Sequence, residues 1–178
     1  MNGKNMEQGS NKNWSMADIS EKNISRRVAI AGGKILVGAE AFELIGKKAM
    51  PKGDPIAMAE IAGIQAAKQT PSLIPLCHPI SLNRVMIHSV PRPDDHSVEL
   101  FCVAEIAEKT GVEMEALTGL SVALLTIWDL TKPVNAALEI SNTRLLFKSG
   151  GKRGTWVHPE GLPPEAESII AQLHQPPP

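Results

Sequence analysis

The chain has 178 residues, of which 43% are hydrophobic and 21% are charged, and its formal net charge is -1. This length fits one domain, and the hydrophobic share is large enough for a core. A nucleic-acid-binding protein is disfavoured, because it normally needs a basic surplus and aromatic stacking platforms, whereas this chain has three Phe, three Trp and no Tyr. Two cysteines, Cys77 and Cys102, are too few for a disulfide scaffold or a four-thiolate zinc site, which favours a reducing compartment.

The two ends of the chain differ from its middle in composition. Residues 1–16 are polar and rich in Asn, Gly and Lys, so we expect a disordered tail. Residues 159–178 are rich in proline, and we expect a second tail with no more than a loose helical turn. One folded domain, residues 17–158, is expected between them. Because the first residues form no apolar run and no stretch reaches the ~18 apolar residues of a membrane span, the sequence predicts a cytoplasmic protein with no membrane partner.

The first half of the chain predicts one strand and two helices. Residues 27–31 are apolar enough for a strand, which should end at the Gly-Gly pair that follows. Residues 38–48 predict a short helix. Residues 55–69 predict a longer helix, with Asp54 as its N-cap and Pro55 at its first position. Small side chains dominate this second helix, so we expect it to be buried in the domain or at a subunit contact.

The second half predicts a hairpin, a long helix and a last strand. Residues 84–90 and 97–106 alternate as strands around a proline-containing connection. Residues 112–130 repeat apolar side chains at steps of three and four, which predicts a helix with one packed face. Residues 138–147 predict the last strand. The sequence therefore predicts an α+β fold, with an antiparallel sheet and helices packed on one face.

Two short segments could bind an anion or move a proton. Lys52 stands next to a predicted helix N-terminus, whose free N–H groups favour anions, although these residues alone favour a capped helix with a solvated lysine. His78 follows Cys77 between apolar residues, and it could be a proton donor or a buried histidine with satisfied hydrogen bonds. Cys77 itself could be a core residue.

The long helix carries acidic residues at both ends. Thr110 and Glu113 match a capping box, which would give Glu113 a structural role. Glu115 and Asp129 lie fourteen positions apart on nearly the same face, which separates them by ~21 Å along the helix axis. Two groups so far apart cannot both contact one small substrate. If both ends are catalytic, either each serves a different site or two chains build one site.

A basic, glycine-rich segment, Lys148–Gly154, follows the last predicted strand. Its glycines and cations suit a phosphate group, although it lacks the spacing of a Walker A loop and could be a mobile basic loop. Together with Lys52 and Lys132, it supplies several cations beside a few isolated carboxylates. A triphosphate substrate with proton-transfer chemistry would need such a set.

Three long segments closely resemble the signature of the cyclic pyranopterin monophosphate synthase family, the MoaC family, and the resemblance covers about residues 16–154. The segments are KGDPIAMAEIAGIQAAKQTPSLIPLCHPISL from Lys52 to Leu82, KTGVEMEALTGLSVALLTIWDLTKPV from Lys109 to Val134, and RLLFKSGGKRG from Arg144 to Gly154. The opening MADISEK and the nearby Arg27 also resemble the family. Trp128 and the Leu130-Thr131 pair depart from the usual residues, and Gly119 stands where Ala is common, which costs up to ~1 kcal/mol of local helix stability.

The resemblance implies a ferredoxin-like α+β fold and a lyase. Its substrate would be 3′,8-cyclo-7,8-dihydro-GTP, and its products cyclic pyranopterin monophosphate, a molybdenum cofactor precursor, and pyrophosphate. The implied assembly is a hexamer of three dimers with active sites at subunit contacts. No dedicated cofactor is implied, and Mg²⁺ carried by the triphosphate remains compatible with the reaction.

The resemblance also implies the site residues, with no metal ligand among them. The catalytic positions are Lys52, Asp129, Lys132 and Lys148. The substrate-binding positions are Cys77, His78, Glu113, Met114, Glu115, Arg27 and Lys22.

Each implied position has a hypothetical role. Lys52 and Asp129 transfer protons, and Lys132 and Lys148 stabilise phosphate charge. His78 and one of the two glutamates hold the base and sugar, and Lys22 and Arg27 bind the outer phosphates. A non-catalytic nucleotide or pterin sensor is the alternative, but a sensor has no need of the acid–base set.

Overall fold

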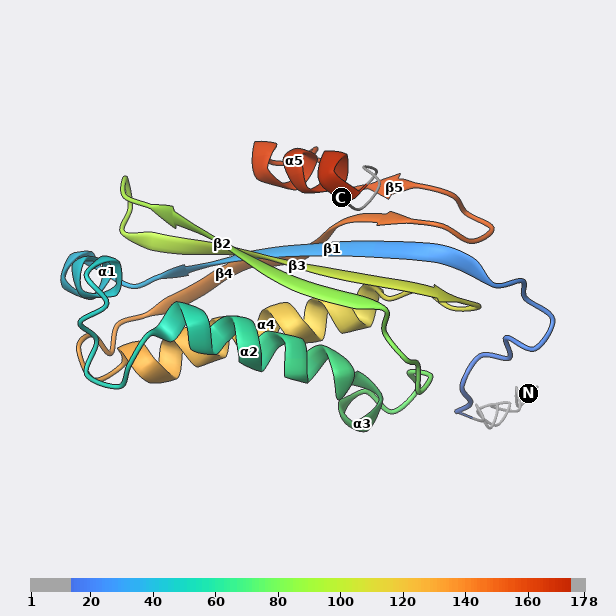
Figure 1. Ribbon diagram of the computed structural model, residues 1–178, viewed down its shortest axis with the longest axis horizontal. Helices are drawn as coiled ribbons and strands as arrows, with labels where there is room; N and C mark the ends of the chain where they lie inside the picture. Colours follow the sequence, from blue (N-terminus) through green and yellow to red (C-terminus); the bar gives the residue numbers. More distant parts are fainter. Residues whose placement is uncertain (1–13, 174–178) are drawn as a thin grey trace, which may run out of the picture.

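The computed structural model describes residues 14–173, so most of the predicted N-terminal tail and the last five residues lie outside the described part. Five antiparallel strands form one sheet in the order β2-β3-β1-β4-β5 (Figure 1). The strands are β1 (Ser25–Leu36), β2 (Arg84–Arg92), β3 (Ser97–Glu108), β4 (Glu139–Ser149) and β5 (Trp156–Val157). The helices are α1 (Ala39–Gly46), α2 (Pro55–Lys68), α3 (Thr70–Leu73), α4 (Glu113–Thr131) and α5 (Pro164–Leu173).

The α+β prediction is confirmed. The central elements follow the order β1-α2-β2-β3-α4-β4, which is compatible with a ferredoxin-like arrangement. Helices α2 and α4 lie side by side against one face of the sheet (Figure 1). Alternate residues of β1 and β3, such as Ala29, Ile35 and Leu100, point into this layer and form the larger core.

The two long helices approach closely because both have a glycine where they cross. A Cβ at Gly63 would lie 2.9 Å from the carbonyl oxygen of Gly119, and a Cβ at Gly119 would lie 2.9 Å from the Sγ of Cys102. The expectation that α2 is buried in the domain is confirmed for one face of the helix, which carries Ala59, Gly63, Ala66 and Ala67. Gly119 is a packing requirement here, and not only a loss of helix propensity.

The opposite face of the sheet is covered by α5, which the sequence did not predict as a full helix. Ala166, Ile169 and Leu173 are buried against apolar residues of the sheet such as Ile30 and Phe101. The expectation of helices on one face holds for α2 and α4. Beyond the last strand, however, the chain forms a three-turn helix on the second face in place of a loose turn.

Strand β1 is longer than predicted. It continues through Gly32 and Gly33 to Leu36, because it hydrogen-bonds to β3 on one side and β4 on the other. Gly32 lacks a side chain for a packing reason, because a Cβ at this position would lie only 2.6 Å from the Cδ1 of Leu146. The glycine pair therefore marks a close contact with the core and does not end the strand.

Helix α4 is long and apolar enough to meet the length and composition criteria for a membrane span. Its apolar side chains have another explanation, because residues such as Leu120, Leu124 and Ile127 are fully buried in the larger core. We therefore interpret α4 as the core helix of this domain.

Candidate active site

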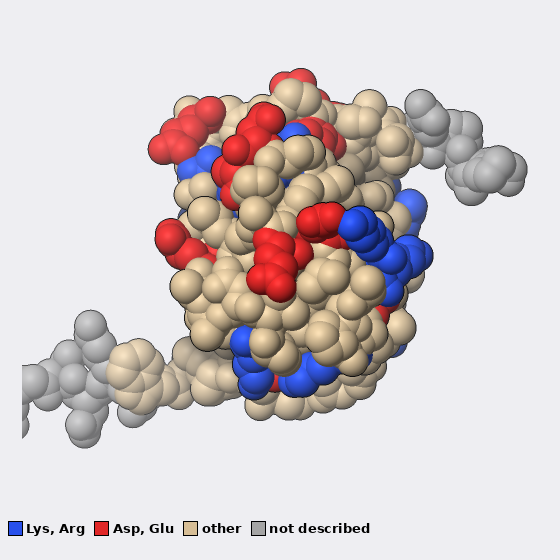
Figure 2. Space-filling view, turned by 90° about the vertical axis from the view of Figure 1, so that its left-hand side faces the viewer, with Lys and Arg blue, Asp and Glu red and all other residues tan. Residues whose placement is uncertain are grey.

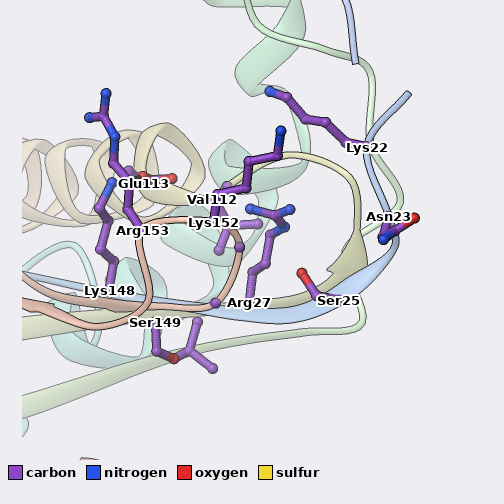
Figure 3. A pocket seen from close by; sticks show the side chains of 14 residues that line it. Lys22, Asn23, Ser25, Arg27, Val112, Glu113, Lys148, Ser149, Lys152 and Arg153 are labelled. Atoms are coloured by element: carbon purple, nitrogen blue, oxygen red, sulfur yellow. Dashed lines mark hydrogen bonds and ion pairs between the residues drawn. The ribbon is translucent and has the colours of Figure 1, made fainter. Parts of the chain in front are cut away.

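A cavity of about 600 Å³ lies at the end of the molecule where α4 begins. Side chains from the N-terminal segment, β1, the start of α4 and the loop after β4 line it (Figure 3). Its charged lining residues are Lys22, Arg27, Glu113, Lys148, Lys152 and Arg153. Five of these six side chains are cationic, so the cavity favours an anionic ligand.

The sheet register sets two of these cations side by side. Lys148 of β4 lies opposite Ala29 of β1, and Arg27 is two residues from Ala29 on the same face. The guanidinium of Arg27 is fixed by backbone carbonyls: its Nε donates to Glu108 at 2.8 Å and its Nη2 donates to Lys109 at 3.1 Å. The arginine is therefore held in place before a ligand binds.

Glu113 supplies the only carboxylate among the described residues that line this cavity. Its Oε1 accepts a hydrogen bond from the Nζ of Lys148 at 2.8 Å, and both side chains are about 30% exposed. The predicted capping box is wrong, because Val112 is the N-cap, no side-chain hydrogen bond caps it, and Glu113 is the first residue of α4. An acidic residue there still interacts favourably with the helix dipole.

The loop after β4 needs its glycines. Gly150 and Gly151 have φ angles of 97° and 73°, which other residues rarely adopt. A Cβ at Gly150 would overlap the carbonyl oxygen of Arg26, and a Cβ at Gly151 would overlap the guanidinium of Arg27. The loop therefore lies directly on the start of β1, which brings its own cations to the same cavity as Arg27.

The N-terminal segment is bound to this end of the domain by two side chains. The Nε2 of His78 donates to the carbonyl oxygen of Ala17 at 2.8 Å, and the Nζ of Lys109 donates to that of Ser20 at 2.8 Å. These contacts hold the segment that carries Lys22, which lines the cavity. In this structure, His78 therefore positions the chain segment at the cavity.

Cys77 and Glu115 lie near the same end of α4. Glu115 is only 3% exposed, and burial, with a smaller effect from Glu113, raises its pKa. Burial also raises the pKa of the Cys77 thiol, and the charge of Glu115 adds to the effect. A thiol with a raised pKa is a weaker nucleophile near neutral pH. Glu115 is buried in this structure, so its carboxylate is not exposed to a ligand. Met114, between the two glutamates, is 37% exposed.

The remaining predicted site residues form a second cluster at the other end of α4. The Nζ of Lys132 lies 2.7 Å from one carboxylate oxygen of Asp129, and the Nζ of Lys52 lies 3.3 Å from the other. Lys132, followed by Lys52, lowers the pKa of Asp129. Figure 2 views this end of the molecule: Lys and Arg side chains gather near the lower edge, and Asp and Glu side chains with a second group of Lys and Arg lie above them.

The structure thus divides the predicted site residues into two groups. Lys22, Arg27, Glu113 and Lys148 come together at the start of α4, whereas Lys52, Asp129 and Lys132 come together at its end. Glu113 and Asp129 are sixteen positions apart on this helix, which corresponds to ~24 Å along its axis. Lys132 and Lys148, predicted to act on the same phosphates, are therefore far apart within one chain.

Sequence comparison identifies relatives of this chain. The sequence model of the MoaC family matches residues 16–151. The chain belongs to this family. A protein of Rhodospirillum rubrum named cyclic pyranopterin monophosphate synthase is 43% identical over 141 residues, which cover 79% of this chain and 85% of that protein.

Two further relatives carry the same name. A protein of Streptomyces avermitilis is 46% identical over 142 residues, which cover 79% of this chain and 82% of that protein. A mitochondrial protein of Arabidopsis thaliana is 46% identical over 141 residues, which cover 79% of this chain and 52% of that protein. The matched family region includes every predicted site residue.

Some residues of the cavity were not predicted as site residues. Arg153 was not singled out, and Lys152 was noted only as a cation of a basic loop. Asn23 and Ser25 also line the cavity, and no sequence pattern marked them. Their signal lies in the sheet register, which places the start of β1 beside the end of β4. Among residues 14–173, no group of three or more His, Cys, Asp or Glu side chains could hold a metal ion.

Proposed function

We propose that this protein is a cyclic pyranopterin monophosphate synthase. It converts 3′,8-cyclo-7,8-dihydro-GTP to cyclic pyranopterin monophosphate and releases pyrophosphate, in molybdenum cofactor biosynthesis. The observation that carries the proposal is the cavity at the start of α4, where five cations surround one carboxylate in a chain of the MoaC family.

The cavity binds the triphosphate end of the substrate. Lys22 and the fixed guanidinium of Arg27 contact the outer phosphates, and Lys148 contacts the phosphate that reacts. A sugar hydroxyl oxygen attacks the α-phosphorus and releases its proton to solvent or to the leaving pyrophosphate. The bond from that phosphorus to the bridging oxygen of the β-phosphate breaks, and pyrophosphate leaves with the electron pair. Fixed cations stabilise this developing charge better than mobile water does. The Glu113–Lys148 pair orients the lysine for this role.

The cluster at the end of α4 carries the proton transfers of ring opening and closure. Lys52 is about half exposed and hydrogen-bonds to Asp129, so a proton can pass between them when a substrate group approaches. Lys132 favours the charged form of Asp129 and so keeps that carboxylate available as a base. These roles are supported by the ion pairs and by the match of both lysines to the family signature.

We infer that a second copy of the chain completes each active site. The two clusters are ~24 Å apart along α4, so one small substrate reaches both only if they come from different subunits. A hexamer built as a trimer of dimers satisfies this requirement, since a symmetric contact creates such composite sites repeatedly. The substrate's own phosphates would carry any Mg²⁺ that the reaction uses. Two free cysteines agree with a reducing compartment, and we propose the cytoplasm.

The first experiment is turnover of the purified protein with 3′,8-cyclo-7,8-dihydro-GTP. Pyrophosphate release and the fluorescent oxidised pterin are measured in parallel, and equal amounts of the two products are expected. A correctly assembled oligomer that binds the substrate but yields neither product would instead be a nucleotide or pterin sensor.

A variant separates catalysis from binding. Lys52→Ala should keep the assembly and lower turnover by at least about a hundredfold, the usual contribution of a proton-transfer group. Lys47→Gln is the control, because Lys47 lies at the end of α1 and pairs only with Glu43 among the ion pairs of the described residues. Unchanged turnover in Lys52→Ala would remove Lys52 from the mechanism.

A further inference from the structure

The chain continues beyond the region that matches the MoaC family, and this continuation is built onto the strand that carries Lys148. The family match ends at residue 151, whereas β5 and α5 follow it. Trp156 of β5 pairs with Lys148 of β4, and Val157 pairs with Phe147. One more backbone hydrogen bond, from the N–H of His158 to Leu146 at 2.9 Å, extends the pairing.

Helix α5 fastens this continuation to the rest of the sheet. Its Glu165 accepts a hydrogen bond from the Nη2 of Arg92 at 2.6 Å. At its other end, the carbonyl oxygen of Leu173 accepts a hydrogen bond from the Nη2 of Arg26 at 3.0 Å. Between these two contacts, Ile169 is buried in the smaller core. The helix is thus held at both ends and along its length.

The segment between β4 and β5 is therefore a short loop with both ends fixed. It contains Lys152 and Arg153, and both line the cavity at the start of α4. Figure 3 shows the two side chains on the same side of the ribbon as Lys148 and Arg27. The backbone of the loop lies against the start of β1, where Gly150 touches the backbone of Arg26. Arg26 thus contacts both the loop and the end of α5.

We propose that Lys152 and Arg153 form a clamp for the two outer phosphates of the substrate, and that β5 and α5 are the positioning element that holds the clamp over the cavity. The ligand of the clamp is a pyrophosphate group, free or as part of the triphosphate. Arginine suits this ligand because its planar guanidinium can donate two parallel hydrogen bonds to phosphate oxygens. The proposal rests on the proposed function for the identity of the substrate, but not for the binding of pyrophosphate.

The clamp residues are tested with inorganic pyrophosphate as the probe. Arg153→Gln and Lys152→Gln should each weaken its binding by roughly tenfold in calorimetry, the loss expected for one charge-assisted hydrogen bond. The KM of the substrate should rise by a similar factor. Lys47→Gln removes the same charge at α1 and should leave both values unchanged. Wild-type pyrophosphate affinity in both clamp variants would overturn the proposal.

The positioning element is tested with Ile169→Ala, which loosens α5 without touching the cavity. The proposal expects weaker pyrophosphate binding and a KM raised several-fold, with kcat within about twofold of the wild type. Ser168→Ala, at an exposed position of the same helix, is the matched control. If Ile169→Ala lowers only the thermal midpoint and leaves KM unchanged, α5 is merely structural and the positioning role is refuted.

Glu165→Gln provides a second variant, because it breaks the ion pair with Arg92 and leaves the smaller core intact. It should raise KM in the same direction as Ile169→Ala, and an unchanged KM in this variant would also refute the positioning role. Failure of the proposed function gives a different result. If the wild-type protein shows no turnover but binds pyrophosphate through Lys152 and Arg153, the proposed reaction is refuted and the proposed clamp is supported.

Discussion

Two defective variants of this protein should restore each other's activity when they are mixed. Lys52→Ala removes a cation at the end of α4, and Lys148→Ala removes one at its start. We expect each variant alone to lose at least about a hundredfold in turnover. In the proposed assembly, however, each active site takes one end of α4 from one subunit and the other end from a second subunit.

The size of the recovery follows from counting subunits. When the two variants assemble at random in equal amounts, a site is intact only if its Lys52 comes from a Lys148→Ala chain and its Lys148 comes from a Lys52→Ala chain. Each condition is met half of the time, so about a quarter of the sites, and about a quarter of the wild-type activity, should return. Sites contained within single chains would recover nothing, because every chain carries one defect.

The assay measures pyrophosphate release after the two variants are co-expressed in equal amounts, with native mass spectrometry to verify mixed oligomers. A mixture of Lys52→Ala with Asp129→Asn is the matched control, because both residues belong to the same cluster and no site can receive an intact one. The reasoning from the length of α4 is refuted if mixed oligomers form and the mixture of Lys52→Ala with Lys148→Ala stays inactive.

Three further predictions concern stability and reactivity. Gly119→Ala should gain up to ~1 kcal/mol of helix propensity but lose ~1–3 kcal/mol to overpacking, and its thermal midpoint should fall by ~2–4 °C for each kcal/mol of net loss. Gly46→Ala is the control: it has no atom within 4 Å of the new Cβ and should not lower the midpoint. Burial raises the pKa of Glu115, so its charged form is disfavoured in the folded state. Glu115→Gln should therefore raise the free energy of unfolding at pH 7, and this gain should disappear below pH 4.5, the ordinary pKa of a glutamate. Burial raises the pKa of Cys102 to about 12, so a thiol reagent should modify Cys77 in the folded protein and Cys102 only after unfolding.

Local patterns in the sequence predicted most of the elements. Helix α2 begins where Asp54 and Pro55 predicted, and the side chain of Asp54 accepts hydrogen bonds from the backbone N–H groups of Ile56 and Ala57. The ends of β1 could not be predicted in this way, because a Gly-Gly pair marks a turn as often as a close contact. Only the positions of Leu146 and of the neighbouring strands show that this pair marks a close contact and not a turn.

The sequence misjudged features that depend on partners distant along the chain. Thr110 and Glu113 have the spacing of a capping box, but Glu113 pairs with Lys148, thirty-five residues away. The ion pair therefore uses the carboxylate that a capping box would have directed to a backbone N–H group. Likewise, the apolar residues of α5 look like an isolated cluster until the outer face of the sheet is known.

The division of the candidate residues between the two ends of α4 followed from the sequence, but the balance of charge at each end did not. At the start of α4, one carboxylate faces five cations, so a strong positive surplus remains for a ligand. At the end of α4, Asp129 lies between two lysines, so only one positive charge there is left without a carboxylate. A large surplus of fixed cations binds phosphates, whereas a carboxylate hydrogen-bonded to a lysine can exchange a proton with a substrate group. In the proposed mechanism, the two ends of one helix provide the two halves of the reaction, and a second copy of the chain brings them to one substrate.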